Sequence, residues 1–191
     1  MVSDNKVSFE NQTVIVTGAA RGIGAATARL VASRGAKVFA FDINQDGLRE
    51  LQQELALADN QIGHLNIGDQ KSITSVIDSV IKNAGKIDAL INTAGIVGPT
   101  NVKVENVNWA DFENTLRVNL YGTIWLTQAV VPHMKAAKYG RIAHVASIAG
   151  KEGNPGMSPY NVSKSGMIGF IKGVAKEIAP DGITINALAP A

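Results

Sequence analysis

The sequence predicts an α/β fold built on a doubly wound, mostly parallel sheet, and two observations support this prediction. Six short runs rich in apolar and β-branched residues alternate with five longer segments of helical length. Several of the runs are apolar on both faces, as strands must be when helices cover both sides of a parallel sheet. The 191 residues fit one domain, 1–191, that is long enough to bury a sizeable core.

The predicted elements follow one another along the whole chain. Strands are expected at Thr13–Thr17, Lys37–Phe41, Gln61–Asn66, Asp88–Asn92, Arg141–Ala146 and Ile183–Leu188. Helices are expected at Ile23–Arg34, Asp46–Ala58, Gln70–Asn83, Trp109–Met134 and Pro159–Ile178. Gly35, Gly85, Pro180 and Gly182 are typical helix stop signals at the ends of three of these helices. The Gly- and Pro-rich stretch Ser147–Ser158 is expected to be irregular, and it is either a pocket wall or a solvated connector.

Composition and charge exclude several functions. The net charge is only +2, and no block of like charges is present, so we expect no nucleic-acid partner. The N-terminus lacks the apolar core of a signal peptide and the apolar stretches are short, so we expect a cytoplasmic protein without a membrane partner. There is no cysteine, and His64, His133 and His144 lie at no metal-ligand spacing, so no metal is expected. His144, in an apolar strand, is expected to be a hydrogen-bonded core histidine.

A glycine-rich turn joins the first strand to the first helix. Gly18, Gly22 and Gly24 are spaced G-x-x-x-G-x-G, with Arg21 and Ile23 between them. Glycines let backbone approach a pyrophosphate, and the following helix N-terminus supplies N–H groups and partial positive charge. The turn is therefore a candidate phosphate-binding site of a dinucleotide, although three glycines in a turn also occur for structural reasons alone.

Asp42 ends the second predicted strand, 18 residues after Gly24. A carboxylate there can accept hydrogen bonds from the adenosine ribose and would repel a 2′-phosphate, which favours NAD over NADP. Arg21 acts in the opposite direction, because a cation in the turn could attract that phosphate. The alternative interpretation of Asp42 is a helix N-cap.

Tyr160 and Lys164 begin the last predicted helix. Their i, i+4 spacing places the phenol and the ammonium on one helix face. An ordinary tyrosine, with a pKa of about 10, is a poor base at neutral pH. A neighbouring ammonium favours the phenolate, so the pair can exchange a proton with a substrate hydroxyl. By itself, however, Y-x-x-x-K usually marks only a solvated helix face.

Together these motifs resemble the short-chain dehydrogenase/reductase family, in its non-extended branch. The shared features are TGAARGIG at 17–24, NTAG at 92–95, Asn119, Ser147 and the Tyr160/Lys164 pair, in the family's order and at its approximate spacing. The resemblance covers essentially the whole chain. It implies a Rossmann-like dinucleotide-binding and catalytic domain that uses NAD, rather than NADP, to interconvert a secondary alcohol and a ketone.

The resemblance also implies a role for each matching residue. Tyr160 would be the general acid/base, and Lys164 would bind the nicotinamide ribose and lower the pKa of the tyrosine. Ser147 would hold the substrate oxygen, and Asn119 would anchor a water in a proton relay. The residues implied to contact the cofactor are Gly18, Arg21, Gly22, Ile23, Gly24, Asp42, Asn66, Ile67, Asn92, Ala94, Gly95, Tyr160, Lys164 and Pro190.

Three features depart from the family pattern. Asn66 replaces a usual Asp beside the adenine, although its amide oxygen can still accept a hydrogen bond, and Thr93 replaces the second Asn of the NNAG motif. The chain is also shorter than usual, so we expect it to lack the last strand and the substrate lid. This shortening favours the alternative of a catalytically silent dinucleotide-binding or regulatory module, whereas the intact catalytic positions argue against it.

The segment 146–164 is similar to bacterial members that act on sugar acids, polyols or 3-oxoacyl thioesters, with Asn154 and Met157 as candidate substrate contacts. The resemblance further implies a homodimer or homotetramer, joined through a four-helix interface formed by Trp109–Met134 and Pro159–Ile178. Trp109, Phe112 and Trp125 are accordingly expected in the core or at a subunit interface.

Overall fold

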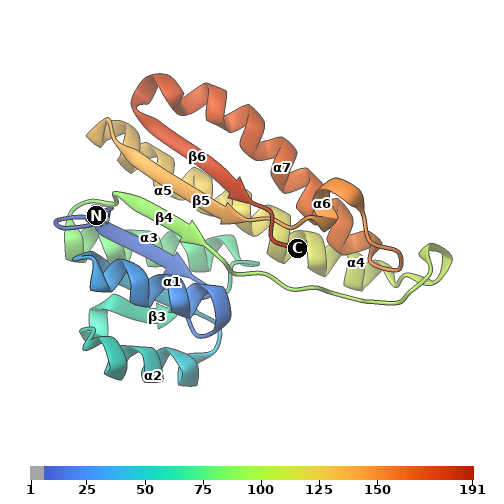
Figure 1. The fold of residues 1–191 in the computed structure, drawn as a ribbon, viewed down its shortest axis with the longest axis horizontal. Coiled ribbons are helices and arrows are strands. Elements are labelled where there is room, and N and C mark those ends of the chain that lie inside the picture. The colour runs from blue at the N-terminus through green and yellow to red at the C-terminus, as the bar shows by residue number, and fades with distance from the viewer. Residues whose placement is uncertain (1–6) are drawn as a thin grey trace, which may run out of the picture.

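A single parallel sheet organises the computed structural model, which describes residues 7–191. The strands lie in the order β3-β2-β1-β4-β5-β6 (Figure 1). Their bounds are β1 Thr13–Thr17, β2 Lys37–Asp42, β3 Ile62–His64, β4 Ala89–Asn92, β5 Gly140–Val145 and β6 Ile183–Leu188. The order reverses between β1 and β4, where α/β folds bind ligands at the carboxyl ends of the strands. The predicted doubly wound fold is confirmed.

Helices cover both faces of the sheet. Their bounds are α1 Gly22–Ser33, α2 Gln45–Leu55, α3 Gln70–Ala84, α4 Trp109–Leu116, α5 Gly122–Ala137, α6 Ala149–Glu152 and α7 Ser158–Ile178. Alternate residues of β1 serve the two faces, because Val14 and Val16 pack with α1 and α2. Ile15 points the other way, into the larger core that α3, α5 and α7 complete. Both faces are apolar, as the pattern of the runs predicts.

Three elements differ from the sequence-based prediction. The single helix expected at Trp109–Met134 is divided into α4, a π-helical turn Arg117–Tyr121, and α5. β3 is shorter than expected, because the chain leaves the sheet after His64 to form part of a cavity wall. The stretch expected to be irregular contains α6, whose start is supported by Ser147 Oγ, which accepts a hydrogen bond from Ala149 N at 3.2 Å.

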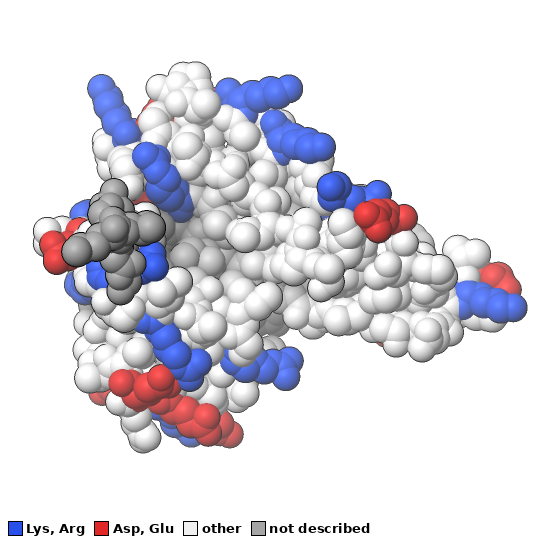
Figure 2. Space-filling model, viewed as in Figure 1, with Lys and Arg blue, Asp and Glu red and all other residues white. Residues whose placement is uncertain are grey.

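The outer surface shows little that would attract a large charged partner. Figure 2 shows lysine and arginine side chains standing apart on one face, without a continuous basic surface among the described residues drawn there. No helix within residues 7–191 has the length and apolar character needed to cross a bilayer. Nor do three or more His, Asp or Glu side chains of that range gather as a metal ion would require.

A buried polar network lies at the carboxyl ends of β1, β4 and β5. Asn92 accepts a hydrogen bond from Thr17 Oγ1 at 2.6 Å, and its amide nitrogen lies 3.2 Å from His144 Nδ1. An amide nitrogen only donates, so Nδ1 is the acceptor and Nε2 carries the proton. Thr127 Oγ1 lies 3.0 Å from that Nε2 and gives its own hydrogen to Thr123 O. The geometry thus requires a neutral His144, as expected for a hydrogen-bonded core histidine.

Burial has the same effect on the charge of His144. The ring is fully buried, and desolvation, reinforced by the nearby charge of Lys164, lowers the pKa of His144 to about 3. Protonation would also place a second donor against the amide nitrogen of Asn92 and break the network. The folded state therefore keeps this imidazole neutral at physiological pH.

A pH dependence of stability follows from His144. Below its ordinary pKa of 6.5 the unfolded chain binds a proton there, whereas the folded chain does so only near pH 3. The free energy of unfolding should therefore fall as the pH is lowered between these values, by about 1.4 kcal/mol per pH unit from this group. Urea denaturation between pH 7 and pH 4 gives the free energy of unfolding of the wild type and of His144→Gln. The contribution of His144 is the pH dependence of the difference between these two free energies. A difference that does not vary with pH would contradict a neutral His144.

Candidate active site

The glycine-rich turn is shaped by how closely β1 and β4 approach at their carboxyl ends. Gly18 has a φ of +70°, and a Cβ on it would lie 2.7 Å from Ala94 N and 2.8 Å from Thr93 Oγ1. A Cβ on Gly24 would overlap the carbonyl oxygen of Gly18. Gly22 also has a positive φ, +54°, but a Cβ on it would meet no atom within 4 Å. Gly18 and Gly24 therefore allow the turn to close, and Gly22 faces open space.

The N-terminus of α1 is suited to an anion. Its N-cap, Arg21, makes no side-chain capping hydrogen bond, and the first turn of the helix contains no acidic residue. The first N–H groups of a helix have no partner inside the helix and carry partial positive charge. Together with the open space before Gly22, this arrangement fits the pyrophosphate of a dinucleotide.

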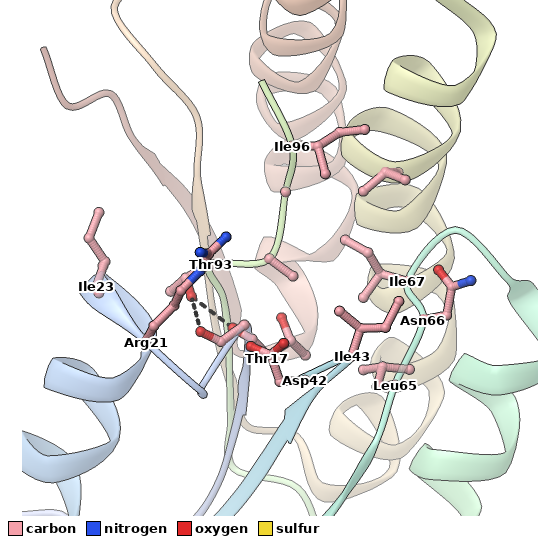
Figure 3. A pocket seen from close by; sticks show the side chains of 16 residues that line it. Thr17, Arg21, Ile23, Asp42, Ile43, Leu65, Asn66, Ile67, Thr93 and Ile96 are labelled. Atoms are coloured by element: carbon pink, nitrogen blue, oxygen red, sulfur yellow. Dashed lines mark hydrogen bonds between the residues drawn. The ribbon is translucent and has the colours of Figure 1, made fainter. Parts of the chain in front are cut away.

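A cavity of about 370 Å³ opens above this turn, at the switch point of the sheet (Figure 3). Arg21 and the hydrogen-bonded Thr17 and Thr93 lie on one side of the close-up, and Ile43, Leu65 and Ile67 gather on the other. The wall thus carries most of its polar side chains near the glycine-rich turn, with Ile23 beside them, and most of its apolar ones beyond β2, with Asn66 beside them. This division matches a dinucleotide, which has a charged pyrophosphate and a flat adenine.

Asp42 stands between these two regions. Its Oδ2 accepts a hydrogen bond from Ala20 N at 3.0 Å, and its Oδ1 accepts one from Asn44 N at 2.9 Å. The carboxylate therefore ties the glycine-rich turn to the end of β2, and its remaining lone pairs are available to ribose hydroxyls. The alternative interpretation of Asp42 as a helix cap is wrong, because Asn44 caps α2 through a bond from Gly47 N.

Most of the expected cofactor residues line this cavity. Those on its wall are Gly18, Arg21, Gly22, Ile23, Gly24, Asp42, Asn66, Ile67, Ala94 and Gly95. Asn92, Tyr160, Lys164 and Pro190 are not part of the wall. Asn92 is 1% exposed, and its side chain lies in the polar network behind the wall, so its place beside the cofactor stays a prediction.

Sequence reasoning missed six wall residues: Thr17, Ile43, Leu65, Thr93, Ile96 and Val118. Thr17 and Thr93 carried a usable signal, since they lie within the TGAARGIG and NTAG motifs, and Ile43, Leu65 and Ile96 each adjoin a residue that was predicted. Val118 carried none, because the fold alone brings the π-helical turn to this wall.

Lys164 and Tyr160 lie next to this cavity, on the first two turns of α7. Lys164 is 4% exposed, its Nζ donates to Val145 O at 2.7 Å, and it lies 5.6 Å from the centre of the Tyr160 ring. A Cβ on Gly95 would lie only 3.8 Å from this Nζ, so the ammonium borders the cavity wall. Burial lowers the pKa of Lys164 to about 8, which leaves it mostly charged at neutral pH.

Asn119 joins the cavity wall to α7. Its Oδ1 accepts a hydrogen bond from Ile96 N at 2.8 Å, and its Nδ2 donates to Ile96 O at 2.8 Å and to Ser163 Oγ at 3.1 Å. The side chain is fully buried within the π-helical turn. Both amide hydrogens are thus used by protein groups, and the water-anchoring role that the resemblance implies for Asn119 stays a prediction.

Ser147 lies two residues after the end of β5 and leads into α6. Its oxygen accepts from Ala149 N, and no acceptor within residues 7–191 takes its hydrogen. α6 is docked on α7 beside Lys164, where Ser165 Oγ donates to Gly150 O at 2.7 Å. A Cβ on Gly150 would lie 2.7 Å from the carbonyl carbon of Lys164. These contacts fix the Ser147 segment to the helix that carries Tyr160 and Lys164.

Comparison with known proteins gives consistent results. The short chain dehydrogenase family model matches residues 12–191. A 3-oxoacyl-[acyl-carrier-protein] reductase of Thermotoga maritima is 39% identical over 184 residues, which cover 95% of this chain and 74% of the relative. A 2-dehydro-3-deoxy-L-rhamnonate dehydrogenase (NAD(+)) of a Sphingomonas species is 38% identical, with 96% of this chain and 72% of the relative covered.

Solved structures show the same arrangement of the chain. NAD+-bound xylitol dehydrogenase is 32% identical, with a TM-score of 0.88 over 96% of this chain and 71% of its own. A metagenomic short-chain oxidoreductase in complex with NADP is 30% identical, with a TM-score of 0.91 over 97% of this chain and 84% of its own. These neighbours hold two different nicotinamide dinucleotides.

Proposed function

The chain belongs to the short-chain dehydrogenase family of oxidoreductases, and we propose that it interconverts a secondary alcohol and a ketone with NAD as cofactor and Tyr160 as general acid/base. One observation carries the proposal. Gly95 lines a cavity that suits a dinucleotide, and a Cβ on Gly95 would lie 3.8 Å from Nζ of the charged Lys164, which has Tyr160 beside it.

Each of the three side chains near Gly95 and the start of α7, those of Tyr160, Ser147 and Lys164, has its own role in the proposed reaction. When bound, the nicotinamide exchanges a hydride with the substrate carbon that bears the oxygen. Tyr160 Oη donates a proton to that oxygen as a ketone is reduced, and it takes the proton back as an alcohol is oxidised. Ser147, whose hydrogen is not used within the described residues, holds the same oxygen. Lys164 has two N–H groups besides the one on Val145 O, and these bind the ribose hydroxyls.

Asp42 supports NAD as the cofactor. It is a negative charge on the cavity wall at the end of β2, and a carboxylate after that strand is the usual partner of the adenosine ribose hydroxyls in dinucleotide-binding folds. Arg21 also lines the cavity, but Asp42 is held by two backbone hydrogen bonds, whereas Arg21 has no capping bond to fix it. A fixed like charge excludes a phosphate more strongly than a mobile cation attracts one.

The proposed substrates are sugar acids, polyols or 3-oxoacyl compounds. The two relatives described above are a 3-oxoacyl reductase and a sugar-acid dehydrogenase, and one structural neighbour is a xylitol dehydrogenase. The alternative of a catalytically silent dinucleotide-binding module would need a site unable to transfer a proton. The arrangement of Ser147, Tyr160 and Lys164 favours the enzyme.

We also propose that the chain forms a homodimer or homotetramer through α4, α5 and α7. Trp109 stacks on Phe112 at a centroid distance of 5.1 Å, yet it is 67% exposed. Tyr121 and Val162, on the same group of helices, are 40% and 47% exposed. Exposed aromatic and apolar side chains of this kind are typical of subunit interfaces.

The role of Tyr160 is tested by Tyr160→Phe, which removes only the hydroxyl. We expect kcat/KM to fall by roughly 10²–10⁴, the usual contribution of a general acid/base, while the Kd for NADH stays within twofold. Absorbance at the NADH band measures turnover across polyols and sugar acids with NAD+, and across 3-oxo esters with NADH. Activity that survives in Tyr160→Phe would rule out the mechanism, and a wild type inactive on the whole panel would favour the silent module.

Cofactor choice is tested by Asp42→Asn, with Arg21→Ala as its matched control on the same wall. We expect the wild type to bind NADH more tightly than NADPH, and Asp42→Asn to reduce this preference about tenfold, or about 1.4 kcal/mol, by removing the repulsion. Arg21→Ala should keep or increase it. Fluorescence titration of the three proteins with NADH and with NADPH gives one ratio of Kd values for each protein. Tighter NADPH binding by the wild type would show that Arg21 outweighs Asp42.

A further inference from the structure

The segment Gly153–Met157, between α6 and α7, is held by a side chain that the catalytic scheme does not use. Asn161 Oδ1 accepts a hydrogen bond from Asn154 N at 3.0 Å, and Asn161 Nδ2 donates to Asn154 O at 2.8 Å. The amide thus pairs with both backbone groups of one residue, as a neighbouring strand would. Asn161 directly follows Tyr160 on α7, so it joins the segment to the helix that carries the proposed acid/base.

The opposite side of the segment rests on the β4–α4 loop. Val102 N donates to Gly156 O at 3.2 Å, and a Cβ on Gly156 would lie 2.9 Å from Asn101 Cα. In Figure 1 the chain after α6 runs beside this loop, near the end of α4. The segment is exposed from Gly153 to Pro155, and both Gly153 and Gly156 have positive φ values, +75° and +71°. It is therefore an exposed turn that is fixed on two sides, by Asn161 of α7 on one side and by the β4–α4 loop on the other.

A second asparagine amide pairs in the same way with the backbone of one residue, on the cofactor side of Tyr160 and Lys164. Asn119 pairs its amide with the N–H and C=O of Ile96, which lies in the cavity wall. Asn161 pairs its amide with the N–H and C=O of Asn154. One asparagine fixes the cofactor side of the site, and the other fixes a segment that takes no part in the cofactor cavity. The two asparagines thus hold two different walls around Tyr160.

We propose that Asn161 is a positioning residue that holds Gly153–Met157 beside Tyr160 as a substrate-binding wall, and so sets substrate affinity without acting on the cofactor or the proton. This rests on the proposed function. Asn154 and Met157 belong to the wall, and they are the residues through which it would contact a polar or acyl substrate. Without the amide, Asn154 loses both of its bonds to α7. The turn then keeps its contact with the β4–α4 loop and the backbone bonds at its two ends, Gly153 N to Ala149 O and Asn161 N to Met157 O.

Trypsin tests the hold of Asn161 on Asn154, here called the clamp, without any substrate, because Lys151 lies in the last turn of α6, two residues before the segment. We expect Asn161→Ala to speed cleavage after Lys151 at least fivefold, measured by mass spectrometry of the peptide that begins at Glu152. Asn154→Ala is the matched control: it keeps the backbone groups that Asn161 binds, so this cleavage should stay within twofold of the wild type. Cleavage in Asn161→Ala at the wild-type rate would overturn the inference.

Kinetics then separate positioning from a purely structural role. With ethyl acetoacetate and NADH, and with xylitol and NAD+, Asn161→Ala should raise KM about five- to tenfold and leave kcat and the Kd for NADH within twofold. Asn161→Asp keeps the acceptor for Asn154 N but loses the donor to Asn154 O, so its KM should lie between those of the wild type and Asn161→Ala. A Kd for NADH that rises with KM, or a kcat that falls alone, would overturn the inference. Inactivity of all variants and of the wild type would count against the proposed function, while the tryptic result would still decide the clamp.

Discussion

The pairing of the Asn119 amide with Ile96 is the contact on which the site depends most. It joins the cofactor wall after β4 to the π-helical turn, and through Ser163 it reaches α7. Ser163 in turn donates to Tyr160 O at 2.8 Å. A buried amide without partners costs about 1–3 kcal/mol per unsatisfied group, so this geometry is strongly favoured. This side chain thus helps to fix the proposed acid/base relative to the cavity, together with the bond from Lys164 to Val145 and the docking of α6 on α7.

The layer behind the site is polar, whereas the rest of the core is apolar. Thr17, Asn92, His144 and the two threonines of α5 satisfy one another across three strands and a helix. Each donor has a defined acceptor, so the strand ends that carry the glycine-rich turn and the NTAG motif cannot shift independently. The neutral imidazole is essential to this order, because a protonated one has no acceptor to offer Asn92. The cavity is consequently shaped before any ligand binds.

Much of this arrangement could be predicted from the sequence, because the signals are local. The apolar runs predict the strands, the glycines predict the turn after β1, and the Tyr160–Lys164 spacing predicts a shared helix face. The features that were missed depend on residues far apart in the chain. The π-helical turn forms where Asn119 meets Ile96, 23 residues away, and His144 acquires its partners from β4 and α5. The partners of Asn92 could not be predicted for the same reason: the NTAG motif marks a strand end, but only the packed sheet brings its first residue to Thr17, Thr123 and His144.

The central claim is that the Asn119 amide couples the cofactor wall to the catalytic helix, and Asn119→Ala tests it most directly. In a folded variant, we expect the Kd for NADH to rise at least tenfold and hydrogen exchange at the Ile96 amide to accelerate, although Tyr160, Lys164 and Ser147 are all unchanged. Asn119→Asp, which keeps the acceptor for Ile96 N, should retain more of the protection than Asn119→Ala. A folded Asn119→Ala chain whose NADH affinity and Ile96 exchange both stay within twofold of the wild type would contradict the account.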